Sequence, residues 1–212
     1  MKLQPKQTLL FIGDSITDCD RPRPHGENIA WCGLGQGYVS LVDALLGVEY
    51  PDVVLSVKNT GINGNRVIDL EKRWTEDVLA HKPDWLSIMI GINDVWRQFD
   101  SPTIEQVDIV KFEKVYRSLI EKTLPSLKGL VLMTPFLIEP NINDPMRAMM
   151  SEYGAVTEKL AGEYGAVFVD TQAAFDAFLE HRSNMTLCAD RVHPNMVGHM
   201  ILARAFVRAI QG

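Results

Sequence analysis

We predict from the sequence an α/β fold in which helices cover both faces of a central, parallel sheet of five strands. Short apolar segments alternate along the chain with longer segments of helical periodicity, which is the pattern of strand–helix–strand units. The apolar segments are continuous rather than alternating, as expected for strands that are buried on both faces. The chain has 212 residues, which are enough for one well-buried core and too few for two domains of comfortable size. We therefore expect one three-layer domain over residues 1–212.

Five apolar segments are predicted to form the strands, and each ends in a polar or glycine-rich turn. Ligands bind sheets of this kind at the carboxyl ends of the strands. The residues that directly follow the strands are therefore the first candidates for a functional site. The predicted strands are Thr8 to Ile12, Val53 to Lys58, Trp85 to Ile90, Leu130 to Thr134 and Ala166 to Val169.

Five segments of helical periodicity lie between and after the strands. Pro145 lies in the first turn of the fourth of them, where a proline is tolerated. In the last one, Met196, Met200, Ala203 and Val207 should mark one apolar face. The predicted helices are Tyr38 to Leu46, Val67 to Ala80, Phe112 to Thr123, Pro145 to Tyr164 and Met196 to Ile210.

Composition argues against nucleic acids and membranes as partners. The formal net charge is -6, and no run of Lys and Arg supplies a basic face. The apolar segment Thr8 to Ile12 is shorter than the hydrophobic region of a signal peptide, and no segment approaches the roughly 20 apolar residues that span a bilayer. Cys19, Cys32 and Cys188 are an odd number without metal-ligand spacing, and we expect free thiols. The protein is expected to be cytoplasmic.

Two segments carry the residue types of nucleophilic catalysis. Ser15 follows the first strand within Gly13 to Thr17, where a glycine would let the backbone turn sharply and expose the hydroxyl. Near the other end, two residues separate Asp190 from His193, so one compact turn can present both side chains on the same side. A serine needs an imidazole base, and the imidazole needs a carboxylate on its other nitrogen. We therefore expect Ser15, His193 and Asp190 to act together, although each segment alone is also typical of an ordinary turn.

Two further segments offer hydrogen-bond donors for an oxyanion. Asn93 follows the third strand, and its side-chain amide could stabilise the negative charge that develops during acyl transfer. Gly64 follows the second strand, and its backbone N–H can approach an oxygen closely because no side chain intervenes. Both segments also have the composition of simple turns. Together with the N–H of Ser15, they predict an oxyanion hole.

Together, the segments from Gly13 to Pro194 resemble the signature blocks of the SGNH (GDSL-type) hydrolases. In that family the nucleophilic serine lies in a Gly-Asp-Ser block, and two residues separate the aspartate from the catalytic histidine. The sequence has no G-x-S-x-G segment, which argues against the α/β-hydrolase alternative. The four signature residues of the family correspond to Ser15, Gly64, Asn93 and His193.

Three segments are also similar to those of intracellular acetylxylan esterases: Phe11 to Asp18, Ser87 to Arg97 and Gly198 to Phe206. The resemblance implies a flavodoxin-like SGNH hydrolase fold, a homo-oligomer, and removal of acetyl groups from xylo-oligosaccharides with no metal ion or other cofactor. A general short-chain acyl esterase, a thioesterase and a lysophospholipase remain as alternatives, because one fold hosts many sites. A sugar-binding module without activity is a further alternative, which the intact serine, aspartate and histidine argue against.

Four residues close to these blocks are candidates for substrate binding. Trp31 and Trp96 offer flat faces on which a sugar ring could stack, or they only pack the loops. Asp14 and Arg97 either contact the substrate or support the reacting residues. His199, on the last predicted helix, is expected to be structural rather than catalytic.

Overall fold

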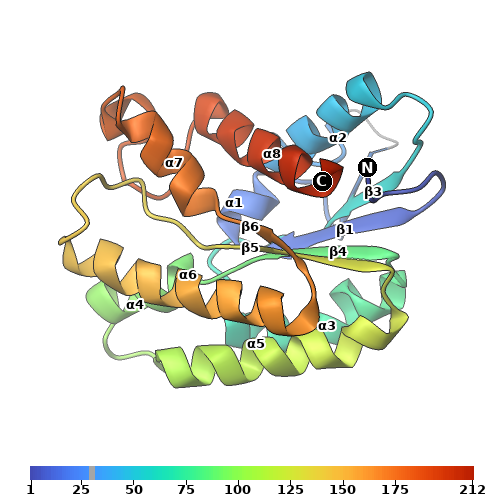
Figure 1. Ribbon diagram of the computed structural model, residues 1–212. Coiled ribbons are helices and arrows are strands. Elements are labelled where there is room, and N and C mark those ends of the chain that lie inside the picture. Colours follow the sequence, from blue (N-terminus) through green and yellow to red (C-terminus); the bar gives the residue numbers. More distant parts are fainter. Residues whose placement is uncertain (29–31) are drawn as a thin grey trace.

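The computed structural model describes residues 1–28 and 32–212, and its six strands form one sheet in the order β2-β3-β1-β4-β5-β6 (Figure 1). Neighbouring strands are parallel except for β2, which pairs antiparallel with β3 at the edge. The predicted α/β fold around a parallel sheet is confirmed, with one short antiparallel strand added. The strands are β1 (Thr8–Gly13), β2 (Gly26–Glu27), β3 (Ser56–Asn59), β4 (Trp85–Met89), β5 (Gly129–Met133) and β6 (Val167–Val169).

Helices cover both faces of the sheet, giving three layers (Figure 1). On one face α8 packs against α2 and α7, and on the other α5 packs against α3 and α6, with α4 beside α6. Three short 3₁₀ helices lie at Leu79–His81, Leu124–Ser126 and Asn184–Thr186. The α-helices are α1 (Ser15–Asp18), α2 (Tyr38–Glu49), α3 (Val67–Asp77), α4 (Ile92–Asp100), α5 (Ile109–Thr123), α6 (Pro145–Tyr164), α7 (Thr171–Leu179) and α8 (Met196–Gln211).

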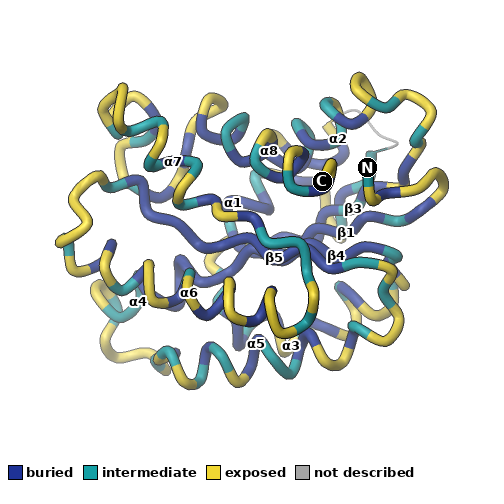
Figure 2. The backbone as a smooth tube through the Cα atoms, viewed as in Figure 1, coloured by how far each residue is buried: buried dark blue, intermediate teal, exposed yellow. Residues whose placement is uncertain are grey.

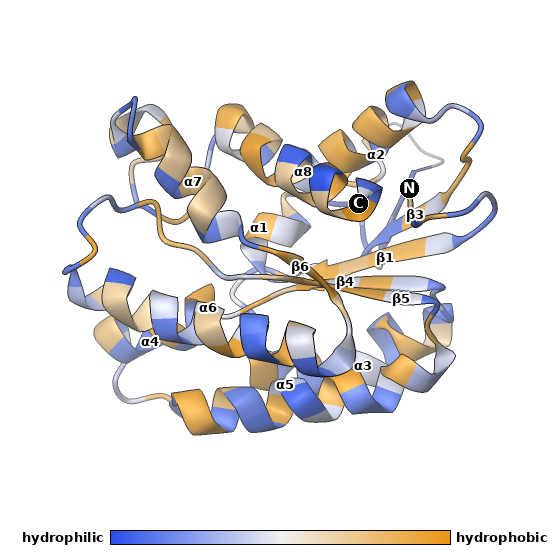
Figure 3. Ribbon diagram, viewed as in Figure 1, coloured by the Kyte–Doolittle hydropathy of each residue, from blue (hydrophilic) through white to orange (hydrophobic). Residues whose placement is uncertain are grey.

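The core lies between the sheet and the two helix layers. Every residue of β4 is buried, and Leu9 to Ile12 of β1 are fully enclosed. Figure 2 shows the strands as a buried band with the exposed residues on the outer sides of the helices, and Figure 3 shows the apolar residues gathered in the same band. Burial on both faces explains why the strands appear in the sequence as continuous apolar runs. Among the described residues, we find no helix with the length and apolar character needed to cross a bilayer.

The helices differ from the prediction in number and in one buried face. Helices α1, α4 and α7 were not predicted. Helices α1 and α4 begin only two and three residues after the ends of β1 and β4, in segments that have turn composition. In α8 the expected face is wrong at Met196, which is 56% exposed at the first turn of the helix. Two residues of the expected face, Ala203 and Val207, are buried, and the buried face also includes His199, Leu202, Phe206 and Ile210.

The order of the strands creates a crevice at one point of the sheet. From β1 the chain proceeds to β3 on one side and then to β4 on the other side, so the connections diverge at β1. Such a switch point is where doubly wound sheets bind ligands, at the carboxyl ends of the strands. Ser15 follows β1, the segment 60–66 follows β3, and Asn93 follows β4. The fold therefore gathers the predicted site residues at one edge.

Candidate active site

Ser15, His193 and Asp190 form one chain of side-chain contacts, although 178 positions separate Ser15 from His193. Oγ of Ser15 lies 2.9 Å from Nε2 of His193, and Nδ1 of His193 lies 2.6 Å from Oδ2 of Asp190. The Ser15 hydroxyl can donate to Nε2 only when the ring proton is on Nδ1, and a carboxylate beside Nδ1 selects that tautomer. The three side chains therefore have the geometry of a Ser-His-Asp triad.

A surface turn between α7 and α8 presents both Asp190 and His193. The backbone reverses at Arg191, which has a left-handed φ of 68°. Oδ1 of Asp190 accepts the N–H groups of Val192 and His193 at 3.0 and 2.9 Å, which fixes the carboxylate against the turn. Burial raises the pKa of Asp190, but the hydrogen bonds from His193 and Val192 outweigh it and hold the pKa below its usual range. Asp190 is thus ionised at neutral pH, as an orienting carboxylate must be.

Ser15 begins the short helix α1, directly after β1. Asp14 caps this helix, because its Oδ1 accepts a backbone N–H of the first turn at 3.0 Å. Space rather than a positive φ requires the glycine at position 13. A Cβ atom there would lie 2.4 Å from both the carbonyl oxygen of Met89 and Oγ1 of Thr17. Glycine is therefore needed at position 13 because β1, β4 and α1 approach one another closely there, and not because the backbone turns sharply.

The two predicted oxyanion donors lie in neighbouring segments. Gly64 is exposed and has a φ of 76°, a conformation that favours glycine. Asn93 is 4% exposed, and its Nδ2 donates to the carbonyl oxygen of Asn65 at 3.1 Å. The backbone N–H groups of Ser15 and Gly64 make no hydrogen bond to the part of the chain that the structure describes. The site thus offers two backbone donors and links the Asn93 amide to the loop of Gly64.

A cavity of about 400 Å³ opens beside Ser15 and His193. His199 contributes to its wall, with Nδ1 accepting the backbone N–H of Tyr38 at 3.2 Å and Nε2 lying 3.6 Å from Sγ of Cys19. Burial lowers the pKa of His199 to about 4, so its ring is neutral. Sequence reasoning did not place most of these residues at the site, although several are close in sequence to Ser15 or His193. The cavity is lined by Ser15, Ile16, Cys19, Asp20, Asn63, His193, Pro194 and His199.

Comparison with known proteins identifies the family. The GDSL-like lipase/acylhydrolase family model matches residues 11–201, which include the triad and both oxyanion candidates. The chain belongs to this family. An acetylxylan esterase from Geobacillus stearothermophilus is 54% identical over 212 residues, which are 99% of this chain and 96% of that protein. The family predicted from the sequence is therefore confirmed.

Solved structures of similar proteins agree with the fold. The crystal structure of an acetylxylan esterase from Geobacillus stearothermophilus has a TM-score of 0.96 at 53% identity and covers 100% of this chain and 97% of that one. An alpha/beta hydrolase from the metagenome of Lake Arreo in Spain has a TM-score of 0.97 at 43% identity, over 100% and 98% of the two chains. Catalytic mutants of the Geobacillus enzyme replace a serine at position 15, and an aspartate and a histidine three positions apart, by alanine. Asp190 and His193 have the same spacing.

Of the aromatic candidates, Trp96 lies beside the triad of this GDSL-like protein. Its ring centroid is 6.1 Å from that of His193, with the two planes inclined by 53°. The Arg97 guanidinium covers the Trp96 ring at 4.7 Å from its centroid and pairs with Asp100 at 2.8 Å. Trp31 lies outside the described residues. A role for Trp96 and Arg97 in substrate binding stays a prediction. No group of three or more metal-ligating side chains is found in residues 1–28 and 32–212.

Of the two roles expected for Asp14, support of the reacting residues rather than contact with substrate fits its position, because Asp14 is 1% exposed and caps α1 from within the core. Asp94 is equally buried, and both of its carboxylate oxygens accept the N–H of Val67 at the start of α3, at 3.0 and 3.2 Å. Burial raises the pKa of Asp14 to about 7 and that of Asp94 to about 8, against the weaker opposite effect of their backbone hydrogen bonds. Between pH 3.8 and about 7, both carboxyl groups therefore hold protons in the folded state that the unfolded chain would release.

Replacing Asp94 by asparagine is expected to make stability less dependent on pH. Between the unfolded pKa of 3.8 and the folded pKa of about 8, the folded state binds a proton that the unfolded state does not, so stability falls as pH rises. Each such carboxyl lowers the free energy of unfolding by about 1.4 kcal/mol per pH unit. Denaturant unfolding of the wild type and Asp94→Asn at pH 6.5 and pH 8 measures the difference.

Between pH 6.5 and pH 8, the change in stability reports the titration of Asp94 and not that of His199. His199 has a folded pKa of about 4 and an unfolded pKa of 6.5, so it adds stability as pH rises towards 6.5 and contributes little above it. The amide that replaces the Asp94 carboxyl in the variant keeps an oxygen that can accept the N–H of Val67. We expect the stability of Asp94→Asn to decline less than that of the wild type. Parallel declines in the two proteins would show that Asp94 is ionised in the fold.

Proposed function

We propose that this GDSL-like protein is a serine esterase that removes acetyl groups from acetylated xylo-oligosaccharides. The observation that carries the proposal is the contact of 2.9 Å between Ser15 and His193, completed by Asp190. The acetylxylan esterase from Geobacillus stearothermophilus, 54% identical over nearly the whole of both chains, supports the substrate class. The cavity beside Ser15 supplies space for an acyl group next to the hydroxyl.

The proposed reaction is acyl transfer in two steps. His193 takes the proton of Ser15 as the hydroxyl oxygen attacks the acetyl carbonyl carbon, and Asp190 stabilises the resulting imidazolium. The carbonyl oxygen becomes an oxyanion that accepts hydrogen bonds from the N–H groups of Ser15 and Gly64 and from the Asn93 amide. His193 then gives the proton to the sugar oxygen as the bond between that oxygen and the acetyl carbon breaks. Water enters and attacks the acyl carbon while it gives a proton to His193. The bond from the Ser15 oxygen to the acyl carbon then breaks, His193 returns the proton to that oxygen, and acetate leaves.

We expect acetyl esters to be preferred over longer acyl esters of the same alcohol. Each added methylene contributes about 0.8 kcal/mol where an apolar pocket can receive it, which would favour octanoyl esters in an open apolar channel. The cavity beside Ser15 carries Asp20, Asn63 and His199 on its wall, and these polar side chains do not suit an octanoyl chain. The measurement is kcat/KM for acetyl, butyryl and octanoyl esters of one alcohol, followed by acetate release from acetylated xylo-oligosaccharides.

The outcome of that series distinguishes the alternatives. A preference for octanoyl esters would support a lysophospholipase or a general acyl esterase, and a preference for acyl thioesters would support a thioesterase. Acetate release from xylo-oligosaccharides with a clear acetyl preference supports the sugar deacetylase. Hydrolysis of activated acetate esters with no acetate released from the sugars would leave a short-chain esterase and overturn the proposed substrate.

The setting of this activity is also proposed. We expect a cytoplasmic homo-oligomer in which residues 1–212 form one catalytic domain that needs no cofactor. Cys19 and Cys188 are free thiols in the fold, which suits a reducing compartment. Trp96, beside the His193 ring, and Arg97, which covers Trp96, are the proposed contacts to a sugar unit of the substrate.

A further inference from the structure

The loop that carries Gly64 is held by side chains of α1, of the segment that follows α1, and of α3. We call residues 60–65 the Gly64 loop. From the side of α1, Oδ2 of Asp18 accepts the N–H of Asn63 at 3.0 Å, and Nε of Arg21 donates to the carbonyl oxygen of Gly61 at 2.7 Å. From the side of α3, the loop meets the guanidinium of Arg73. Sequence reasoning assigned no role to this arginine.

Arg73 contacts both ends of the Gly64 loop with one planar group. Its Nε donates to Oδ1 of Asn65 at 2.7 Å, and its Nη1 donates to the carbonyl oxygen of Thr60 at 2.6 Å. Nη1 also pairs with Asp77, one turn further along α3, at 2.6 Å. The side chain is 13% exposed, so little water competes for these bonds. The guanidinium therefore fixes the first and last residues of the loop relative to α3.

The same guanidinium also reaches the strand that carries the serine. Nη2 of Arg73 donates to the carbonyl oxygen of Gly13 at 3.1 Å, two residues before Ser15. The carbonyl oxygen of Asn65 accepts the amide of Asn93. Arg73 therefore links the end of β1 to the Gly64 loop. The hydrogen bond between Asn65 and Asn93 links the same loop to the start of α4.

We propose that Arg73 is a positioning residue that holds the N–H of Gly64 at its working distance from Ser15. The inference rests on the proposed esterase function, in which the N–H of Gly64 stabilises the oxyanion. Arg73 touches the backbone that carries the donor and does not touch the cavity lining. A displacement of about 1 Å in such a donor is sufficient to cost about 10²-fold in rate. Lysine cannot replace Arg73, because an ammonium lacks the planar set of donors that spans four acceptors.

The test compares Arg73→Lys, Arg73→Ala and Asn65→Ala with the wild type on an activated acetate ester. We expect Arg73→Lys to lower kcat about 10-fold and Arg73→Ala up to about 10²-fold, with KM changed less than about threefold, because the oxyanion forms only in the transition state. Asn65→Ala removes one acceptor and should have a smaller effect of the same kind. The double variant with Arg73→Lys should be less than additive, since both changes break the bond between Nε and Oδ1.

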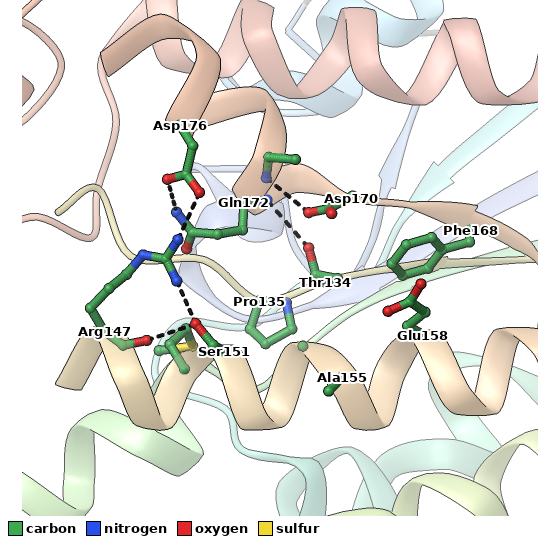
Figure 4. Close-up of a pocket in the computed structure, with 13 residues that line it drawn as sticks. Thr134, Pro135, Arg147, Ser151, Ala155, Glu158, Phe168, Asp170, Gln172 and Asp176 are labelled. Atoms are coloured by element: carbon green, nitrogen blue, oxygen red, sulfur yellow. Dashed lines mark hydrogen bonds and ion pairs between the residues drawn. The ribbon is translucent and has the colours of Figure 1, made fainter. Parts of the chain in front are cut away.

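Arg147 supplies the matched control. It is 5% exposed on α6, and its guanidinium donates to Asp176 at 2.7 Å and to Ser151 within a groove that the triad does not line (Figure 4). Arg147→Ala therefore removes a buried, paired arginine without touching the Gly64 loop. We expect it to lower the melting temperature and to leave kcat at the wild-type value. Melting temperatures of all variants show how much of each change in kcat follows from lost stability.

The outcomes separate this inference from the proposed function. An unchanged kcat in folded Arg73→Lys and Asn65→Ala would overturn the inference, and so would an equal loss of kcat in Arg147→Ala. If Arg73→Ala does not fold, the other two variants still decide. A wild type that hydrolyses the activated ester but releases no acetate from xylo-oligosaccharides overturns the proposed substrate and leaves the role of Arg73 standing. A wild type without any esterase activity would overturn both.

Discussion

Replacing Ser15 or His193 by alanine is expected to abolish measurable ester hydrolysis while leaving the fold intact. Ser15 Oγ and His193 Nε2 are 2.9 Å apart, and the proposed reaction needs both the nucleophile and its base. Removing one member of a triad typically costs about 10⁴-fold or more in kcat. The double variant should therefore be scarcely less active than either single variant. Initial rates with an activated acetate ester, measured at saturating substrate, test this expectation.

Stability measurements provide the control for both substitutions. The side chain of His193 is 47% exposed, so its truncation removes little buried surface, and Ser15→Ala removes only the hydroxyl group. We expect melting temperatures close to that of the wild type. An organophosphorus reagent that modifies serine should label the wild type and not Ser15→Ala. Retention of most of the activity in folded Ser15→Ala would contradict the assignment of the nucleophile.

Asn93→Ala is expected to lower kcat by about 10²–10³-fold and to change KM little. Oxyanion donors act on a charge that exists only in the transition state, so the ground-state complex loses little. In the resting structure the amide donates to the carbonyl oxygen of Asn65 at 3.1 Å, which orients it before substrate arrives. Steady-state kinetics on one acetate ester separate the two parameters. A change confined to KM would instead place Asn93 in substrate binding.

Gln98 offers a matched control on the same helix. Its amide donates to the carbonyl oxygens of Asp94 and Val107 and to the hydroxyl of Tyr153, away from Ser15. Gln98→Ala therefore removes a hydrogen-bonded amide from α4 without removing the oxyanion candidate. We expect a lower melting temperature with kcat preserved. An equal loss of kcat in Gln98→Ala and Asn93→Ala would indicate that α4 as a whole, rather than the Asn93 amide, matters for activity.

The sequence predicted the sheet well because its strands are buried on both faces. The segments that begin at Thr8 and Trp85 contain no charged residue, and their observed strands begin where they were expected. The predicted strand from Val53 begins too early, since Val54 is 70% exposed and β3 starts only at Ser56. Helix α4 was missed because its first residues are those of a turn, Ile92 to Asp94, directly after a glycine. Local composition therefore identified buried strands better than helices that start at a strand end.

The candidate site was predictable where its residues lie close in sequence, and less so elsewhere. The spacing of Asp190 and His193 within one turn predicted their contact, and the Gly-Asp-Ser block located Ser15. The burial of Asp14 was not predictable, because it depends on segments that pack over it from distant parts of the chain. Arg73 was missed for the same reason, since its acceptors at Gly13 and Thr60 are 60 and 13 positions away. Long-range hydrogen bonds to backbone carbonyls leave no pattern in a single sequence.

The exposure of Asp190 and His193 bears on how reactants and products move. Both side chains lie at the outer surface on one turn, so the imidazole that we propose as the base is already in contact with solvent. A branched or chain-like sugar can present one acetyl group to Ser15 while its other units stay hydrated. The freed sugar then departs along the same open route by which water arrives for the second step. Within a single chain, the ester, the water and both products can therefore reach or leave the triad directly from solvent.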